Sequence, residues 1–298
     1  MSRRRQGLPL NGWLIIDKEA GLTSSDVVTR VRRITGAAKA GHGGTLDPLA
    51  TGVLPIALGE ATKTMSFAVA AGKTYRFSVR WGEERSTDDA EGEVTAAHSS
   101  RPSEDAIRAA LPAFIGRIEQ VPPAYSAVKV DGRRAYQLAR QGTVAALAAR
   151  QVVVRTFVLL KVVDEHSAEF EVDCGKGTYV RALARDLGRR LGCYGHVSAL
   201  RRTRVGRFRE ETAISLVKLA DLCQFAPPFE HLLPVETALD DIPALALTGP
   251  QAQRLRSGQA VRVLDTGDGT ICAMHAGKPV ALGEVRGGEV RPVRVFNL

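Results

Sequence analysis

The chain has 298 residues, 44% of them hydrophobic, and carries a net charge of +9 at pH 7. This length and composition exclude a disordered chain and give room for one large or two smaller domains with hydrophobic cores. The excess of positive charge favours a polyanionic partner, either nucleic acid or an anionic membrane surface.

Several classes of protein are excluded by what the sequence lacks. The apolar run 13–16 is followed at once by Asp17 and Lys18, which argues against a signal peptide. No segment approaches the roughly 20 apolar residues that a membrane span needs. The four cysteines stand far apart and form no C-x-x-C pair. A structural metal is therefore not expected, and a reducing cytoplasm is the predicted location.

The first predicted elements are a strand over 12–16 and a helix over about 24–35. Thr23 and Asp26 form a capping-box pair at the start of the helix, an apolar stripe with helical spacing follows, and Gly36 ends it. The glycine-rich segment 41–54 is therefore expected to form a loop after this helix.

This loop holds a single carboxylate. Asp47 is the only acidic residue from Val27 to Gly59, and Pro48 holds it in an extended conformation. It is a candidate nucleophile, although an Asp-Pro pair also initiates turns. The glycines could cradle a phosphate, but the loop lacks the Gly-Lys-Ser/Thr ending of a P-loop. His42 is a packed ring, a metal ligand without partners, or a residue that contacts RNA bases.

Alternating apolar and polar residues predict a half-buried strand over 74–81, with Tyr75 on its core-facing side. An aromatic residue in such a place is more often a core residue than a catalytic one. After an acid-rich connection and a helix over about 103–115, the prolines at 122–123 break regular structure. The basic stretch that follows, which includes Arg133 and Arg134, is predicted to be a surface finger.

Two β-rich runs, 152–163 and 168–174, predict a hairpin. Thr178 is expected to cap the next helix, which has an inward apolar stripe, basic residues largely on its other faces, and Gly192 at its end. Arg181 lies in the first turn of this helix, where the helix dipole disfavours a cation. An anion should compensate it, either an RNA phosphate or the carboxylate of Asp47.

Residues 176–209 contain ten basic residues and one acid, so this segment matches the whole net charge of the chain. Such a density of like charge repels itself without a partner, which favours RNA or DNA binding over a solvated face. The acid-rich segment 210–245 is predicted to be a helix plus a linker. A short helix capped by Thr248 and the glycine-punctuated β runs after it predict a small β domain.

Taken in order along the chain, several motifs resemble those of the TruB family, the bacterial tRNA pseudouridine-55 synthases. They cover nearly the whole chain and comprise the loop 41–55 and the segments 17–24, 73–75, 122–129, 177–181 and 200–203. Gly43, Glu19 and the segment 85–88 depart from the family pattern. These departures bear on local loop details and not on the reaction.

The resemblance implies an α+β pseudouridine synthase fold, with a mixed, mainly antiparallel central sheet flanked by helices. It implies a catalytic domain over 1–245, in which the RNA-gripping finger spans about 122–150. It further implies that 246–298 form a small, β-rich, PUA-like RNA-binding domain.

The resemblance also implies a reaction. The chain would be an isomerase that flips the T-loop uridine of tRNA (U55) out of its stack and converts it to pseudouridine, without a cofactor or metal. Asp47 would be the nucleophile, attacking either C1′ of the ribose or C6 of the uracil, and Arg181 would pair with it. Tyr75 would stack on the base and is a candidate for handling the C5 proton.

The same resemblance assigns the residues that hold the RNA. His42 would occupy the space left by the flipped uridine, and Lys18 would line the site. Tyr179 and Leu200 would form walls of the pocket. The phosphates of the stem and loop would be held by Arg133, Arg134, Arg201 and Arg202.

Two other functions fit the same sequence. A catalytically silent tRNA-binding chaperone would use the same surface, and a guide-RNA-dependent synthase of the dyskerin type would work inside a ribonucleoprotein. The finger favours the stand-alone bacterial form. That form is expected to be a cytoplasmic monomer that acts on the T stem-loop of tRNA, with neither a membrane nor an obligatory protein partner.

Overall fold

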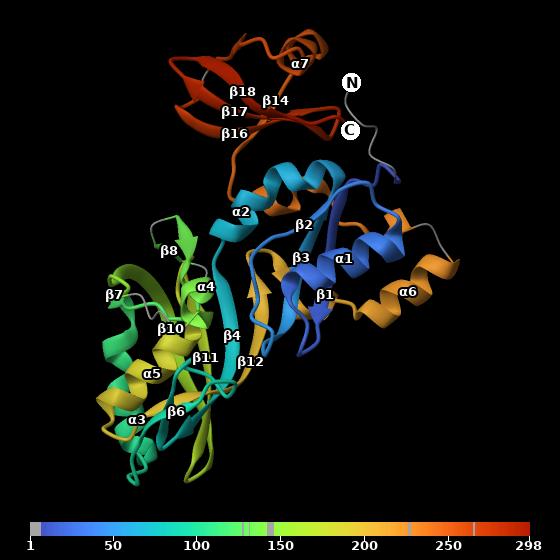
Figure 1. Ribbon diagram of the computed structural model, residues 1–298. Helices are drawn as coiled ribbons and strands as arrows, with labels where there is room; N and C mark the ends of the chain where they lie inside the picture. The colour runs from blue at the N-terminus through green and yellow to red at the C-terminus, as the bar shows by residue number, and fades with distance from the viewer. Residues whose placement is uncertain (1–6, 127, 131, 142–145, 226–227, 265) are drawn as a thin grey trace.

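The computed structural model describes residues 7–298 except 127, 131, 142–145, 226–227 and 265, and it leaves out the side chains of 129, 134, 140, 225, 228 and 229. The chain forms a large unit built on a nine-stranded sheet and a small unit built on a five-stranded sheet (Figure 1). No helix in this described part is long and apolar enough to cross a membrane.

The central sheet of the large unit is mixed and mainly antiparallel. Its strands lie in the order β1-β3-β12-β4-β11-β10-β7, while β2 pairs with β3 and β13 pairs with β12. The pairing of β12 with β3 is parallel and the other pairings are antiparallel. The strands are β1 (Gly12–Lys18), β2 (Ala40–His42), β3 (Thr51–Leu58), β4 (Lys73–Trp81), β7 (Gly116–Gln120), β10 (Arg150–Asp164), β11 (Ser167–Cys174), β12 (Gly195–Val205) and β13 (Phe208–Arg209).

Helix α1 (Ser24–Thr35) begins and ends where the sequence predicts. The Thr23 side chain accepts a hydrogen bond from the Asp26 backbone N–H, the Asp26 carboxylate closes the capping box, and Gly36 ends the helix with a φ of 68°. The other helices of the large unit are α2 (Met65–Ala70), α3 (Glu104–Ala110), α4 (Ala135–Arg140), α5 (Val180–Arg190) and α6 (Leu216–Phe225). Five 3₁₀ turns accompany them: η1 (Gly59–Thr64), η2 (Leu111–Phe114), η3 (Glu210–Thr212), η4 (Pro228–His231) and η5 (Val235–Leu239).

Helices flank the sheet, so the predicted fold class is confirmed (Figure 1). The predicted hairpin is also confirmed and is formed by β10 and β11. Two small hairpins lie outside the central sheet, one formed by β5 (Glu83–Arg85) and β6 (Val94–Ala97) and the other by β8 (Lys129–Val130) and β9 (Arg133–Arg134). The second hairpin and α4 form the described part of the finger.

The core of the large unit is aromatic where β4, β10 and β11 meet. The rings of Phe77 and Phe170 stack with their centroids 5.5 Å apart, and Phe157 packs edge-on against Phe170 at the same distance. Tyr75 lies two residues before Phe77 on the same face of β4, so the core that holds these rings also fixes the Tyr75 strand.

The small unit consists of β14 (Ala244–Ala246), α7 (Gly249–Arg256), β15 (Val261–Arg262), β16 (Gly269–His275), β17 (Lys278–Arg286) and β18 (Glu289–Val295). Thr248 caps α7 as predicted, through a capping box with Gln251. A second hydrophobic cluster joins the two units, because Trp13 and Phe208 of the large unit share it with Phe296.

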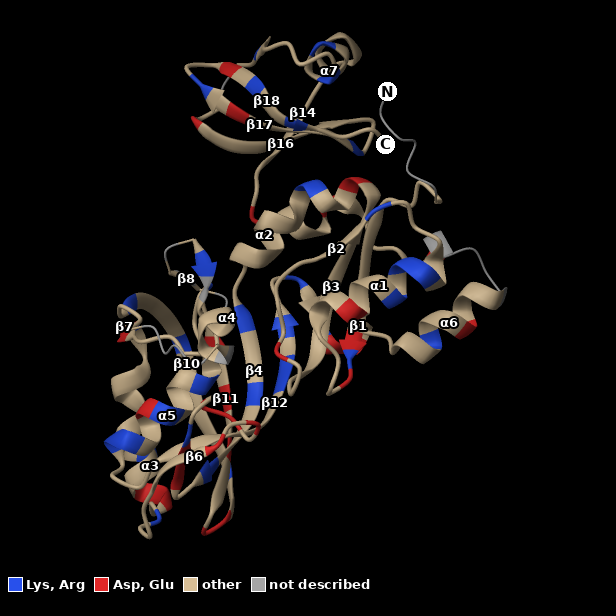
Figure 2. Ribbon diagram, viewed as in Figure 1, with Lys and Arg blue, Asp and Glu red and all other residues tan. Residues whose placement is uncertain are grey.

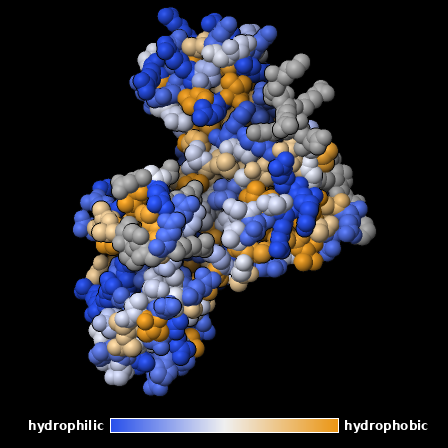
Figure 3. Space-filling view, in the orientation of Figure 1, coloured by the Kyte–Doolittle hydropathy of each residue, from blue (hydrophilic) through white to orange (hydrophobic). Residues whose placement is uncertain are grey.

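Charged residues are spread over both units rather than gathered on one face (Figure 2). On the face drawn in Figure 3, hydrophilic side chains cover much of each unit. Individual ion pairs therefore decide which of the basic residues are neutralised.

Candidate active site

Asp47 lies in the loop between β2 and β3, and the start of α1 holds this loop in place. The Ser24 hydroxyl donates to the carbonyl of Leu46 at 3.0 Å and accepts from the backbone N–H of Leu46 at 2.9 Å. The backbone N–H of Ala50 donates to the Asp47 carbonyl at 3.1 Å, which closes a turn around Pro48. The residue before the carboxylate and the residues after it are thus fixed by the fold.

Two buried cations hold the same loop from beneath. Lys18 Nζ donates to the carbonyls of Glu19, Leu22 and Pro48 at 2.9, 2.8 and 3.1 Å. The Lys18 residue has no exposed surface, so the prediction that it lines the site is wrong. It supports the loop instead, and burial lowers the pKa of its ammonium group to about 8.

Arg202 is the second buried cation. Its guanidinium donates to the carbonyls of Val53, Thr45 and Gly44 at 2.8, 3.0 and 3.1 Å. Arg202 is 0% exposed, so the prediction that it holds RNA phosphates is wrong. All three acceptors are backbone groups of the Asp47 loop or of the strand that follows it. Gly52 is required nearby, because a Cβ there would lie 2.2 Å from the Arg202 carbonyl oxygen.

The Asp47 carboxylate forms an ion pair with Arg181. Arg181 Nε lies 3.0 Å from Asp47 Oδ2, and its NH1 lies 3.3 Å from Asp89 Oδ2. The same guanidinium donates to the carbonyls of Thr87 at 2.9 Å and Tyr125 at 3.0 Å. The Arg181 side chain is 6% exposed and that of Asp47 is 38% exposed, so the carboxylate is open to solvent while its partner is buried. The expected anionic compensation of Arg181 is confirmed, and it comes from protein carboxylates.

The helix that carries Arg181 starts differently from the prediction. Tyr179, not Thr178, is the N-cap of α5, and no side chain caps the helix from this position. Gln120 contacts the N-cap backbone instead: its Nε2 donates to the Tyr179 carbonyl at 3.1 Å, and its Oε1 accepts from the Tyr179 N–H at 2.8 Å. Gln120 is not among the predicted site residues, and its only local signal in the sequence is its place just before the segment 121–123 that leads into the finger.

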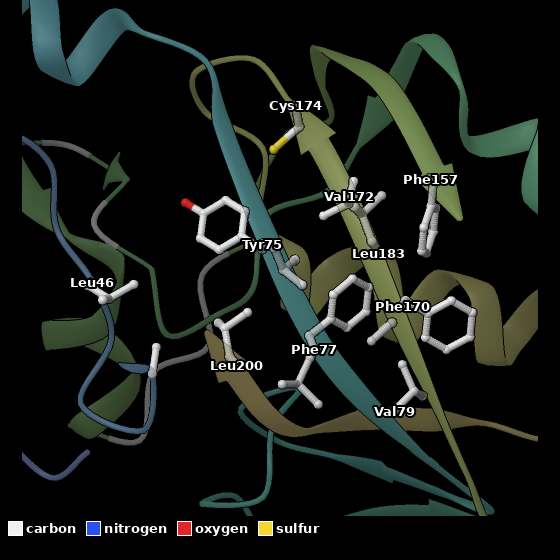
Figure 4. Packing of buried hydrophobic residues seen from close by; sticks show 14 of the residues in the cluster. Leu46, Tyr75, Phe77, Val79, Phe157, Phe170, Val172, Cys174, Leu183 and Leu200 are labelled. Atoms are coloured by element: carbon white, nitrogen blue, oxygen red, sulfur yellow. The ribbon is translucent and has the colours of Figure 1, made fainter. Parts of the chain in front are cut away.

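These elements enclose a cavity of about 280 Å³. Asp47, Arg181, Tyr75, Tyr179 and Leu200 all line it, so the structure brings together five of the predicted site residues. Figure 4 shows the Tyr75 ring projecting from β4 toward the segment that carries Leu46, with its hydroxyl group leading and Leu200 close to the ring. Burial raises the pKa of both tyrosines, so each hydroxyl is neutral at pH 7.

Lys73 also lines this cavity, and its ammonium group caps α2 by donating to the carbonyls of Val69 and Ala71 at 2.9 and 2.7 Å. Burial lowers the pKa of Lys73 to about 8.

His42 is half-buried at the end of β2 and is not among the residues that line the cavity. Burial lowers the pKa of the His42 ring, which is therefore neutral at pH 7.

The basic run 176–209 is largely neutralised within the protein. Arg185 pairs with Asp88 at 2.9 Å, Arg189 with Glu84 at 2.6 Å and Arg204 with Asp173 at 2.9 Å. Arg201 pairs with Asp17 at 2.9 Å and with Glu210 at 2.8 Å. Arg207 pairs with Asp240. The acids come from other parts of the chain, which is why the segment looks unbalanced in the sequence.

Two predictions about this run are therefore wrong. Arg181 and Arg185 do not lie on outward faces of α5 but are buried among acids and backbone carbonyls. The Arg201 guanidinium, predicted to hold phosphates, is occupied by two carboxylates.

The finger keeps part of its predicted character. Arg133 is exposed, and its only hydrogen bond among the described residues goes to Gln141 Oε1 at 2.6 Å. The side chain of Arg134 lies outside the described part of the chain. Among the described residues, Arg133 forms no ion pair and is open to solvent.

Comparisons with known proteins show the family of the chain. Residues 32–180 match the family described as "TruB family pseudouridylate synthase (N terminal domain)", and residues 181–240 match the "tRNA pseudouridylate synthase B C-terminal domain". A protein of Rhodopseudomonas palustris named tRNA pseudouridine synthase B is 54% identical over 99% of this chain and 83% of its own length. One of the same name from a Caulobacter species is 52% identical over the full length of both chains.

Solved structures resemble the whole chain as well. A chain of a Cbf5-Nop10-Gar1 complex superposes with a TM-score of 0.77 at 28% identity, covering 100% of this chain and 91% of the other. A chain of an H/ACA RNP bound to a substrate RNA that contains 2′-deoxyuridine superposes with a TM-score of 0.75 at 26% identity, covering 100% and 92%.

Proposed function

The chain belongs to the TruB family of pseudouridylate synthases, which are isomerases, and we propose that it converts the T-loop uridine of tRNA (U55) to pseudouridine with Asp47 as nucleophile. One observation carries the proposal. Among the described residues that line the 280 Å³ cavity, Asp47 is the only carboxylate, and it combines solvent access with a buried cationic partner, Arg181.

The reaction needs a nucleophile and a place for the base to turn. The bond from uracil N1 to ribose C1′ breaks, a bond from C5 to C1′ forms, C5 loses its proton and N1 gains one. The ionised Asp47 would attack either C1′ or C6, forming an ester or an adduct that later breaks down. Arg181 holds the carboxylate in place by its charge and hydrogen bond, and no group is donated or oxidised.

The walls of the cavity suit a flipped uracil. Tyr75 presents an aromatic ring beside Asp47, and Tyr179 and Leu200 complete an apolar enclosure. Since the Tyr75 hydroxyl is neutral at pH 7, it can relay the C5 proton only by releasing its own as it accepts one. Flipping the base costs a few kcal/mol. We assign His42, as a neutral ring at the end of β2, to the space that the uridine leaves.

The RNA would be held chiefly by exposed cations that have no carboxylate partner. Arg133 on the finger is such a residue, and the small C-terminal unit, a compact β sheet with one helix, would serve as a PUA-like RNA-binding domain. We place the reaction in the cytoplasm and assign it to a monomer.

The rival function is guide-RNA-dependent synthesis, because the solved neighbours come from ribonucleoprotein or multiprotein assemblies. The curated relatives named tRNA pseudouridine synthase B match the chain at 52% and 54% identity, against 26% and 28% for those neighbours. The stand-alone reaction on tRNA is therefore favoured.

The experiment uses the purified chain alone with an unmodified tRNA transcript. Product would be mapped by nucleotide-resolution detection of pseudouridine, and a transcript with cytidine at position 55 serves as the matched control. We expect product at position 55 and none in the control. Product at another uridine, or a requirement for a guide RNA or protein, would contradict the proposal.

A further inference from the structure

The end of α1 and the segment after it carry four cations that form no ion pair within the described part of the chain. Arg30, Arg32 and Arg33 are exposed, and Lys39 is half-buried. We call these four residues the α1 basic surface. It contrasts with the run 176–209, where acids from distant parts of the chain neutralise most of the arginines.

The acids nearest to this surface are engaged elsewhere or do not reach it. Asp26, one turn before Arg30, accepts hydrogen bonds from the Thr23 backbone N–H at 3.0 Å and the Thr23 hydroxyl at 2.6 Å. Glu60 follows Gly59, whose N–H donates to the Lys39 carbonyl, but it pairs with Lys63 at 2.6 Å. Helix α6 packs against α1 and carries Lys218 and Asp221, and Asp221 forms no ion pair with the described residues of α1.

Helix electrostatics alone do not account for these charges. Arg32 and Arg33 lie in the last turn, where a cation is favoured by about 0.3 to 1 kcal/mol. Arg30 lies outside that turn. It is three residues from Arg33, a spacing at which like charges repel by a few tenths of a kcal/mol. The hydrogen bonds from Thr23, and then the charge of Arg30, lower the pKa of Asp26, but no carboxylate of the described residues forms an ion pair with Arg30 or with the other three cations. The surface is therefore available to a polyanion.

The position of the surface relative to the cavity indicates which polyanion. Ser24, at the start of α1, contacts the Asp47 loop, and a helix of 12 residues is about 18 Å long. The basic end therefore lies well outside the cavity, on the lobe that faces the finger across the molecule (Figures 1 and 2). The Lys39 carbonyl accepts a hydrogen bond from the Gly59 N–H at the start of η1, and the carboxylate of Glu60, the next residue of η1, accepts one from the Asn297 N–H, just beyond β18, at 2.8 Å. Figure 3 shows strongly hydrophilic side chains over α1.

We propose that the α1 basic surface binds RNA phosphates outside the stem-loop that enters the Asp47 cavity. This proposal rests on the proposed function, since it takes the RNA to be a tRNA whose T loop occupies the cavity. The phosphates are recognised by charge and not by base sequence.

The test compares two RNAs, a full-length tRNA transcript and its T stem-loop fragment of about 17 nucleotides. The variant is the double substitution Arg30→Gln and Arg33→Gln, which keeps two good helix formers and leaves the Thr23 cap intact. Its matched control is Arg108→Gln with Lys161→Gln, two exposed cations on α3 and β10 whose loss changes the net charge equally. Kd is measured for each RNA at several salt concentrations.

We expect the α1 variant to bind full-length tRNA roughly tenfold more weakly, with the slope of log K against log salt reduced by about 1.5 to 2. Its affinity for the fragment should change less than twofold, and the control should match the unchanged chain on both RNAs. Equal losses on both RNAs, or no loss on either, would overturn the proposal. Pseudouridine formation in the fragment by the unchanged chain tests the proposed function separately, so the two failures are distinguishable.

Discussion

Arg181 Nε lies 3.0 Å from Asp47 Oδ2, which joins the first turn of α5 to the loop between β2 and β3. The same guanidinium contacts Asp89 and the carbonyl of Tyr125 at the root of the finger. One buried cation thus connects the proposed nucleophile, an acidic loop and the finger that we propose to hold RNA.

Replacing Arg181 should affect turnover more than RNA affinity. We expect Arg181→Met to lower kcat by two to three orders of magnitude, on the order of the loss seen when one charge-stabilising donor is removed, and to leave KM within about threefold. Steady-state and single-turnover kinetics on tRNA measure this. A loss of affinity with unchanged kcat would make Arg181 a phosphate anchor.

A second variant separates catalysis from folding at this position. Arg181→Met leaves Asp89 buried without its cation, which is destabilising by itself. The double variant Arg181→Met with Asp89→Asn removes that unpaired charge. We expect it to recover much of the free energy of unfolding while kcat stays low, because the ion pair with Asp47 is still absent.

Lys18 should give stability a distinctive pH dependence. Burial lowers its pKa from 10.5 to about 8, so between these pH values the unfolded chain binds a proton that the folded chain has lost. The free energy of unfolding therefore rises with pH in this window because of Lys18. Relative to Lys18→Met, the unchanged chain should gain up to about 3 kcal/mol from pH 8 to pH 10.5. Urea unfolding at several pH values measures this, and a constant difference would contradict it.

Substitutions of Arg202 and Arg133 should have opposite effects: the first should change the free energy of unfolding, and the second the salt dependence of RNA binding. Arg202→Met leaves three backbone carbonyls, two in the Asp47 loop and one in β3, without this donor and should lower the free energy of unfolding by about 3 kcal/mol or more, with an unchanged salt dependence of RNA binding. Arg133→Gln should leave unfolding within about 0.5 kcal/mol and reduce the salt slope by somewhat less than 1. Urea titration and salt-dependent Kd values for both variants test the pair. A salt-slope change for Arg202→Met would return it to the RNA-binding residues.

Gln120 should act as a positioning residue for Tyr179. Gln120→Met keeps the size of the buried side chain but removes both hydrogen bonds to the Tyr179 backbone. We expect kcat to fall roughly tenfold with KM for RNA unchanged, a loss of about 1.4 kcal/mol in transition-state stabilisation. Gln253→Met, at an exposed position of α7, is the matched control. Equal effects of the two substitutions would show that Gln120 has no special role.

Local signals in the sequence predict the elements that depend on neighbouring residues. Helix α1 follows from the Thr23 capping box and Gly36, and the strand of Tyr75 follows from strict alternation. The pairing of Arg181 with an anion follows from its place at a helix N-terminus. Each of these rests on chemistry within a few residues.

Contacts between distant segments could not be predicted in the same way. The acids that neutralise the run 176–209, such as Asp17, Glu84 and Asp173, carry no local sign of their partners. The hydrogen bonds from Gln120 to the Tyr179 backbone, found in place of the cap expected from Thr178, could not be predicted for the same reason. Charge density along the sequence therefore overstated the RNA-binding surface at Arg201 and Arg202, because burial and pairing are decided by the tertiary fold.

The central claim is that the Asp47 carboxylate is the nucleophile, and Asp47→Asn tests it most directly. The amide keeps the size of the side chain and can still accept a hydrogen bond from Arg181, but it lacks the negative charge. The measurement is single-turnover release of tritium from tRNA that carries 5-tritiated uridine, since C5 must lose its hydrogen when it bonds to C1′. We predict tRNA binding within about threefold of the unchanged chain and a rate at least about 10⁴-fold lower, beyond the usual contribution of a positioned acid or base. Tritium release within tenfold of the unchanged rate would contradict the account.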